Sequence, residues 1–430
     1  MKNKKLGLGV ALFLVVAFTA GAQQYDDEKD FQVERIDGSS ALRITGYVGT
    51  KQELRIPPRI QGMPVTVIGA SAFLRKQLTS VVIPNSVTRI EKQAFMFNQL
   101  TGVVIPNSVI TIEESAFLNN QLTSVVIPNS VTRIEKGAFN GNPLTSVTIP
   151  NSVTYLSGFS GIKTSVVIPN SVTTIGEVAF AGNALTSVVI PNSVTTIENG
   201  AFQNNRLTSV TIPNGVTYLS GFGINQLTSI TIPNGVTTIG RGAFLQNQLT
   251  SVTIPNNVTT IGLGAFSNNR LTNVTIPNSV TTIGDGAFRE NQLTSITISN
   301  RATEIGDFAF FGNRLTSVVI PNSVTTIGSG TFWQNQLTSV TIGTNVTKIG
   351  GAAFAENQLT SVTIPNSVTE IGSAAFAYNQ LTRITIGANV YLRSDDEDGP
   401  AFDNGFDYLY NAQGRRAGTY TYNNGRWNRN

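Results

Sequence analysis

The chain has 430 residues, of which 29 are Lys or Arg, 25 are Asp or Glu, and none is His or Cys. Without His there is no imidazole base, no Ser-His or Cys-His nucleophile and no His metal ligand. Without Cys there are no disulfides, zinc fingers or iron-sulfur clusters. The formal charge of +4 falls to +1 without residues 1–22, which leaves 26 basic and 25 acidic residues. This balance lacks the basic excess that nucleic-acid binding requires.

Residues 1–22 have the pattern of a secretion signal. Lys2, Lys4 and Lys5 are followed by an apolar stretch over residues 6–18 and by small residues, Ala20 to Ala22, before a cleavage site. The alternative is a retained membrane helix, which needs about 20 apolar residues. We therefore predict a signal peptide over residues 1–22, an exported protein, and no integral membrane segment after signal cleavage.

The segments at the two ends of the mature chain differ from the middle. Residues 31–36 and 41–47 alternate apolar and polar side chains around a turn at residues 37–40, so residues 23–52 are predicted to form an N-terminal β cap. Residues 406–410 and 418–422 are rich in aromatic side chains, and we predict a small C-terminal β cap over residues 394–430. Such caps cover the open ends of a repeat array.

Residues 53–393 are a repeat array of 16 rungs, each marked by the residue that follows a Val-x-Ile pattern, usually Pro. Twelve of the 15 intervals between these marks are 22 residues long, and the others are 27, 19 and 20 residues. A period of this size is typical of a solenoid.

One rung shows how the repeat folds. We predict a strand over residues 80–83 that Pro84 ends, a second extended piece over residues 87–90, and a short helical or 3₁₀ turn at Ala94 and Phe95. A single rung cannot bury its apolar side chains, but rungs stacked about 4.8 Å apart can. The predicted fold is a right-handed leucine-rich-repeat coil with a parallel β-sheet on one face and short extended or 3₁₀-helical turns on the other.

An Asn recurs just before the next strand in thirteen rungs. A repeated amide in a turn can bond to backbone groups of its own and the adjacent coil, so we predict a structural ladder. The alternative is an array of Asn ligands. The predicted ladder consists of Asn98, Asn120, Asn142, Asn183, Asn205, Asn225, Asn247, Asn269, Asn291, Asn313, Asn335, Asn357 and Asn379.

The unit from Leu78 to Ile90, followed by Ala94 and Phe95, resembles the repeat of BspA-like leucine-rich-repeat proteins of the treponemal type. The resemblance implies an exported bacterial surface protein, because members of this family are associated with adhesion to host cells, to extracellular-matrix proteins and between bacteria. The family has no shared catalytic residues. Asn stands here where many such repeats carry Cys, which affects packing rather than class.

No motif for chemistry stands out. Gly240 and Gly242 lack the third Gly of a dinucleotide fingerprint. The acidic run at residues 395–398 partly resembles a calcium loop, but Gly405 stands where that loop needs Glu, so we interpret the run as a solvated loop. We expect no cofactor and no metal site.

A glycosidase or lyase is the remaining enzymatic alternative, and it would need carboxylates grouped in a cleft. The close acidic pairs of the array are Glu304 with Asp307 and Asp285 with Glu290, and surface solubility explains them better. We therefore predict that the protein is not an enzyme.

Two surface features suggest where a partner binds. Ser recurs at the first strand position from Ser80 to Ser361, which is either a partner face, a plain β preference or, less favoured, an ice-binding face. Aromatic side chains interrupt the regular turns, and each of the two shortened rungs carries a Tyr in the sequence Tyr-Leu-Ser-Gly-Phe. Because Trp and Tyr are enriched in interfaces, these aromatic residues are candidates for partner binding. The candidate partner-binding residues are Phe97, Phe311, Trp333, Tyr378, Tyr155 and Tyr218.

We therefore expect a non-enzymatic adhesin whose partners are proteins, either host matrix or cell-surface components or other bacteria. The alternative is a periplasmic or surface scaffold that binds bacterial partners or glycans.

Overall fold

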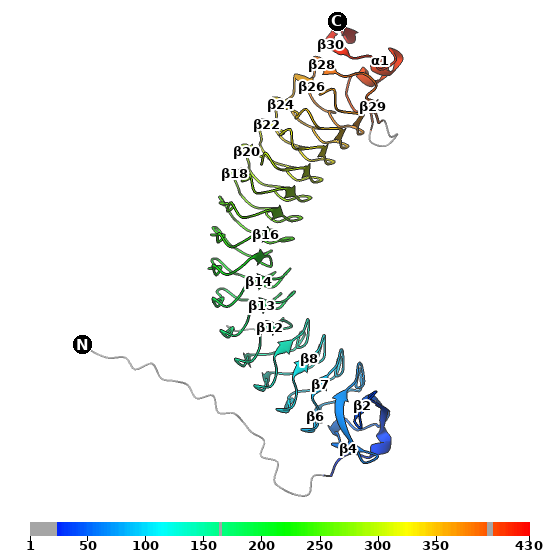
Figure 1. Ribbon diagram of the computed structural model, residues 1–430, viewed down its shortest axis with the longest axis vertical. Helices are drawn as coiled ribbons and strands as arrows, with labels where there is room; N and C mark the ends of the chain where they lie inside the picture. Colours follow the sequence, from blue (N-terminus) through cyan, green and yellow to red (C-terminus); the bar gives the residue numbers. More distant parts are fainter. Residues whose placement is uncertain (1–23, 163–165, 394–398) are drawn as a thin grey trace, which may run out of the picture.

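The computed structural model describes residues 24–162, 166–393 and 399–430. The chain forms a parallel β-solenoid of about 16 turns whose rungs stack into a curved arc with a cap at each end (Figure 1). The predicted leucine-rich-repeat solenoid is confirmed. The predicted signal peptide and the acidic run at residues 395–398 lie outside the described residues.

A 19-stranded sheet runs through the whole solenoid. Apart from β1 (Phe31–Arg35), β2 (Leu42–Tyr47) and β4 (Arg59–Ile60) at its N-terminal end, it is built from the second extended piece of each rung, where the Thr-x-Ile pattern places one side chain outside and the Ile in the core. Each of these strands pairs in parallel with the strand of the next rung, in a register that keeps Ile beside Ile. After β2 (Leu42–Tyr47), its parallel strands are β5 (Met63–Ile68), β7 (Arg89–Ile90), β8 (Thr111–Ile112), β10 (Arg133–Ile134), β12 (Tyr155–Leu156), β13 (Thr174–Ile175), β14 (Thr196–Ile197), β15 (Tyr218–Leu219), β16 (Thr238–Ile239), β17 (Thr260–Ile261), β19 (Thr282–Ile283), β21 (Glu304–Ile305), β23 (Thr326–Ile327), β25 (Lys348–Ile349), β27 (Glu370–Ile371) and β29 (Tyr391–Leu392).

The Ser-x-Thr/Val pieces form a second, interrupted column of strands. Its strands are β3 (Glu53–Arg55), β6 (Ser80–Val82), β9 (Ser124–Val126), β11 (Ser146–Thr148), β18 (Asn273–Thr275), β20 (Ser295–Thr297), β22 (Ser317–Val319), β24 (Ser339–Thr341), β26 (Ser361–Thr363) and β28 (Arg383–Ile386). Over the described residues between β11 and β18 this column has no strand.

The prediction of a strand at residues 80–83 holds for β6, but the continuous sheet lies in the other extended column. The rungs of a curved coil cannot keep the same spacing on every face (Figure 1). Ladder hydrogen bonds need strands about 4.8 Å apart. Only the Thr-x-Ile column keeps ladder pairing along the whole arc.

A column of stacked Phe rings fills the core beneath the turns. Phe73 and Phe95 stack with ring centroids 5.0 Å apart, and the column continues in every rung to Phe376 and Phe402, 4.8 Å apart. The turns above the rings are also joined between rungs, because the Phe95 N–H donates to the Ala116 carbonyl at 2.8 Å. The rungs are therefore held together on the turn side as well as in the sheet.

The predicted N-terminal hairpin is present. After η1 (Glu28–Asp30), β1 (Phe31–Arg35) pairs antiparallel with β2, and β4 (Arg59–Ile60) pairs antiparallel with β5. Phe31 and Tyr47 pack on Phe73, with ring centroids 6.4 and 5.8 Å away. The hairpin thus covers the first ring of the Phe column.

The C-terminal cap contains a helix that the sequence did not indicate. α1 (Phe406–Ala412) precedes the hairpin of β30 (Gly418–Asn423) and β31 (Arg426–Arg429), and β30 pairs antiparallel with β28. The prediction of β structure at residues 406–410 is wrong. Phe406 and Tyr410 are both fully buried and lie one helical turn apart, where both pack on Tyr420. Tertiary packing therefore overrides the β preference of these aromatic residues.

Candidate functional site

The thirteen recurring Asn side chains point into the solenoid and bond to its backbone. In each of them Nδ2 donates to the Phe carbonyl of its own rung and of the preceding rung. For Asn120 these distances are 2.9 Å to Phe95 and 3.1 Å to Phe117, and its Oδ1 accepts the Leu100 N–H at 3.1 Å. Amides bonded in this way are not presented to a ligand.

Three aromatic side chains on neighbouring turns form a cluster. The ring centroids of Phe311 and Trp333 lie 5.0 Å apart. The ring centroid of Phe308 lies 6.1 Å from that of Phe311 and 6.3 Å from that of Trp333. The Arg289 guanidinium lies 4.9 Å from the Phe311 ring centroid. Trp333 Nε1 donates to Glu356 Oε1 at 3.1 Å. Phe311 is buried and Trp333 is half-buried, so this cluster offers one partly exposed indole rather than two exposed rings.

Phe97 and Tyr378 are the exposed aromatic residues of the turn edge. Phe97 is 38% exposed beneath Arg75, whose guanidinium carbon lies 4.9 Å from the ring, and Tyr378 is 73% exposed. Both have a positive φ, of 58° in each case. Residues other than glycine rarely adopt this backbone conformation. Their separation along the chain places them at opposite ends of the array, so they do not form one site.

Tyr155 and Tyr218 lie on the continuous sheet, on β12 and β15, and not on the turn edge. Both are half-buried. The Tyr155 hydroxyl donates to Glu198 Oε2 at 3.3 Å, and the Tyr218 hydroxyl donates to Asn199 Oδ1 at 3.1 Å. Burial, with the nearby Glu198 carboxylate, raises the pKa of Tyr155 to about 12 and raises the pKa of Tyr218 above its usual value. Both phenols are therefore neutral hydrogen-bond donors.

The Ser column is an exposed, uncharged face. Every Ser of this column whose side chain the structure describes is exposed, from Ser80 to Ser361. Exposed Val residues stand two positions further on, including Val167 at 79% and Val189 at 83% exposure. Ser165, also part of the predicted column, lies outside the described residues.

The sheet column carries its charges near its ends and Thr in its middle. Arg43, Arg89 and Arg133 bind carboxylates near the N-terminal end, and Lys348 and Arg393 bind Glu370 near the other. Between them stand Thr174, Thr196, Thr238, Thr260 and Thr282.

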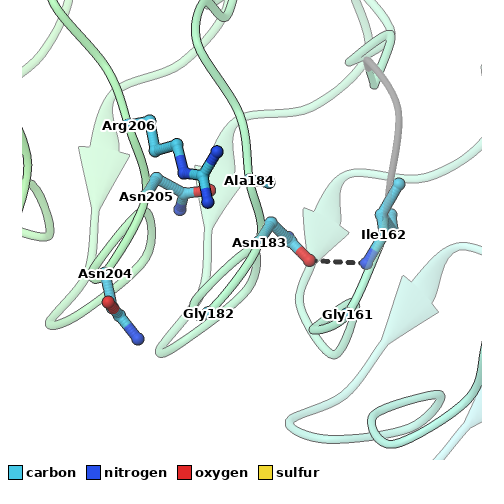
Figure 2. A pocket seen from close by; sticks show the side chains of 8 residues that line it. All are labelled: Gly161, Ile162, Gly182, Asn183, Ala184, Asn204, Asn205 and Arg206. Carbon is cyan, nitrogen blue, oxygen red and sulfur yellow. Dashed lines mark hydrogen bonds between the residues drawn. The ribbon is translucent and has the colours of Figure 1, made fainter.

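Two depressions interrupt the surface near the shortened rungs. One, of about 380 Å³, lies at the turn edge among Gly161, Asn183, Asn205 and Arg206 (Figure 2). Figure 2 shows the Asn183 side chain directed at Ile162, whose N–H it accepts at 2.6 Å. Because Asn183 and Asn205 belong to the ladder, their amides are already used by the backbone.

The other depression, of about 340 Å³, lies on the sheet face and is lined by Glu177, Thr196, Glu198, Asn199 and Tyr218. Its polar groups are not ladder residues. Of these five residues, Tyr218 is the one candidate that the sequence predicts. In the sequence, Glu198 differs from nearby rungs, in which Gly176 and Gly240 occupy the same position.

In the described part of the chain no three His, Cys, Asp or Glu residues gather as a metal site would require. No helix in that part combines the length and apolar character needed to cross a membrane.

The sequence matches the family described as the BspA type leucine rich repeat region, in six copies, over residues 66–161, 157–271, 220–336 and 259–383. No curated protein matches the sequence significantly.

Several solved structures are similar. YopM from Yersinia enterocolitica has 19% identity and a TM-score of 0.51, over 73% of this chain and 68% of that one. A leucine-rich repeat protein from Bacteroides ovatus has 24% identity and a TM-score of 0.49, over 86% of this chain and 91% of that one. A leucine rich cell surface protein from Faecalibacterium prausnitzii has 24% identity and a TM-score of 0.43, over 86% of this chain and 96% of that one. At such identities, the YopM likeness supports the fold alone.

Proposed function

This chain belongs to the family of BspA-type leucine-rich-repeat proteins, and on that premise we propose that it is an exported adhesin that binds proteins of the host matrix or the epithelial surface. The observation that carries the proposal is the repeated, exposed and largely uncharged face of the solenoid, along which the Ser column runs from Ser80 to Ser361. Many weak, similar contacts along one rigid surface add area and avidity.

The carboxylates of the array support a binding role over a hydrolytic one. Asp285 Oδ1 accepts the Asp307 N–H at 3.0 Å, and Asp307 Oδ1 accepts the Ser329 N–H at 2.6 Å. These hydrogen bonds join successive turns, and neither Asp285 nor Asp307 lines either of the two depressions described above, whereas a glycosidase holds its acid and base in a cleft. We propose that the protein is not an enzyme.

Export is part of the proposal and rests on residues 1–22. A basic start, an apolar run and a small-residue cleavage site are the features of a secretion signal. Digestion of intact cells with a protease, followed by detection with an antibody, tests whether the solenoid is at the surface. A periplasmic protein would be protected until the envelope is opened.

The experiment that tests adhesion is concentration-dependent binding of residues 23–430 to immobilised matrix glycoproteins, to epithelial surfaces and to bacterial envelopes. Saturable binding to matrix or epithelium is expected. Binding to bacterial envelopes alone would favour the scaffold alternative, and binding to none would contradict both. Hydrolysis of any member of a glycan panel would contradict the non-enzymatic assignment.

A further inference from the structure

The two shortened rungs follow the same local arrangement. In the first, Arg133 on β10 lies beside Tyr155 on β12 in the sheet register, and Glu135 follows two residues after Arg133. In the second, Thr196 on β14 lies beside Tyr218 on β15, and Glu198 follows two residues after Thr196. The two sets therefore match position by position, with Thr196 in the place of Arg133.

In the first set a guanidinium fills the space between the carboxylate and the ring. The Arg133 guanidinium carbon lies 4.4 Å from the Tyr155 ring centroid, and Arg133 Nε donates to Glu135 Oε1 at 2.8 Å. Stacking on an aromatic face together with a hydrogen bond to a carboxylate is the preferred environment of an arginine side chain.

In the second set that space is open. Thr196 is too short to reach Tyr218 as Arg133 reaches Tyr155, and the depression of about 340 Å³ lies there, with both Glu198 and Tyr218 in its lining. The Tyr218 ring lies across Gly240, where an added Cβ would stand 2.6 Å from the hydroxyl oxygen. The ring therefore packs against Gly240 at one side of the depression.

Glu198 also lacks the charge partner that its counterparts have. Glu91, Glu113 and Glu135 occupy the same rung position, and each forms an ion pair with an arginine. Glu198 Oε2 accepts the Glu177 N–H at 2.9 Å and the Tyr155 hydroxyl at 3.3 Å. Among the described residues no basic side chain forms an ion pair with it. A half-buried carboxylate without a cation favours a ligand that supplies one.

We propose that this depression binds an arginine side chain of a protein partner, in the place that Arg133 occupies in the first set. The guanidinium stacks on Tyr218 and donates to Glu198. Asn199, whose Oδ1 accepts the Tyr218 hydroxyl, and Glu177, whose carboxylate forms an ion pair with Lys136, border the same space. This inference rests on the proposed function, because it names the chemistry of the partner, and it locates one contact of that partner on the sheet.

The test uses saturation-transfer NMR on the full chain with Nα-acetyl-arginine amide as the probe. Nα-acetyl-citrulline amide, which has the same shape and no charge, is the matched ligand control. The variant Glu198→Gln removes the carboxylate, and Thr196→Arg supplies the missing arginine from the chain itself. Glu304→Gln removes an exposed carboxylate elsewhere on the sheet and is the control variant.

We expect saturable binding of the arginine probe, at least about tenfold weaker binding in Glu198→Gln, no binding in Thr196→Arg, and unchanged binding in Glu304→Gln. An unaltered unfolding transition of Thr196→Arg would show that its loss of binding does not come from unfolding of the protein. Equal binding of the citrulline probe, full binding by either pocket variant, or no saturable arginine binding would overturn the proposal. Arginine binding without attachment to any surface would contradict the proposed adhesion and leave the pocket assignment standing.

Discussion

Asn269 Nδ2 donates to the carbonyl oxygen of Phe244 in the preceding rung at 2.8 Å, and also to that of Phe266 in its own rung at 3.0 Å. Its Oδ1 accepts the Leu249 N–H at 3.0 Å. One buried amide therefore satisfies backbone groups on two successive turns. Because the same arrangement recurs along the array, the rungs are joined by side chains as well as by the sheet.

Replacing three successive ladder residues, Asn247, Asn269 and Asn291, with Leu should lower the midpoint of thermal unfolding markedly. Each substitution leaves buried carbonyl and N–H groups without partners, at a cost of about 1–3 kcal/mol per site. Ser251→Leu, on the exposed face, is the control and should leave the midpoint nearly unchanged. Equal midpoints for the triple variant and the control would show that the amides do not stabilise the coil.

The Phe column should tolerate truncation poorly. Phe266 stacks between Phe244 and Phe288 at ring-centroid distances of 5.5 and 5.4 Å and has no exposed surface. We expect Phe266→Ala to cost about 3–5 kcal/mol of unfolding free energy, because neighbouring rings cannot close the cavity. Denaturant titration measures this. A loss no larger than that of an exposed substitution such as Thr253→Ala would contradict the packing described.

Tyr378 should be a stabilising site for substitution. Its φ is 58°, and the equivalent turn residues Asn119 and Gly182, with φ of 54° and 66°, adopt such positive values more readily. Tyr378→Asn should therefore raise unfolding free energy by about 1 kcal/mol. Calorimetry compares the two proteins, and a lower midpoint in the variant would count against backbone strain. Weaker adhesion of the more stable variant would add Tyr378 to the partner surface.

Acid should stabilise the C-terminal cap through Asp407. Burial raises the pKa of this carboxyl from 3.8 to about 6, although the Ala401 and Phe402 N–H groups donate to it and partly offset the effect. Because the folded pKa exceeds the unfolded one, the folded cap binds the proton more tightly. This contribution is present below about pH 4 and is lost as pH rises through 6.

Asp407→Asn keeps the shape of the side chain and cannot ionise. The stability of the natural chain relative to this variant should fall between pH 4 and pH 7, by at most about 3 kcal/mol. Parallel unfolding curves at several pH values measure the difference. A constant difference across this range, or one that grows with pH, would show that Asp407 is ionised in the folded cap throughout.

The sequence predicted the solenoid because twelve of the 15 intervals are 22 residues long and the apolar positions recur within each period. It did not predict α1, since the burial of Phe406 and Tyr410 against Tyr420 is a tertiary effect. It also placed the principal sheet at residues 80–83, because hydrophobic alternation cannot show which face of a curved coil keeps ladder spacing.

The sequence did not predict the pocket at Glu198, for a related reason. Its recognition depends on the register that sets Thr196 beside Tyr218 and Arg133 beside Tyr155. The sequence shows Tyr155 and Tyr218 as irregular residues, but cannot show that one ring is covered by an arginine and the other is not.

The central claim is that partners bind along the exterior of the solenoid. It is tested most directly by comparing residues 23–430 with an in-phase deletion of residues 256–343, which removes four 22-residue periods and joins Pro255 to Thr344. Circular dichroism and thermal unfolding establish that the deletion folds. We predict saturable binding of the full chain to matrix glycoproteins or epithelium, and clearly weaker binding of the deletion. Undiminished binding of the folded deletion would contradict distributed contact along the array.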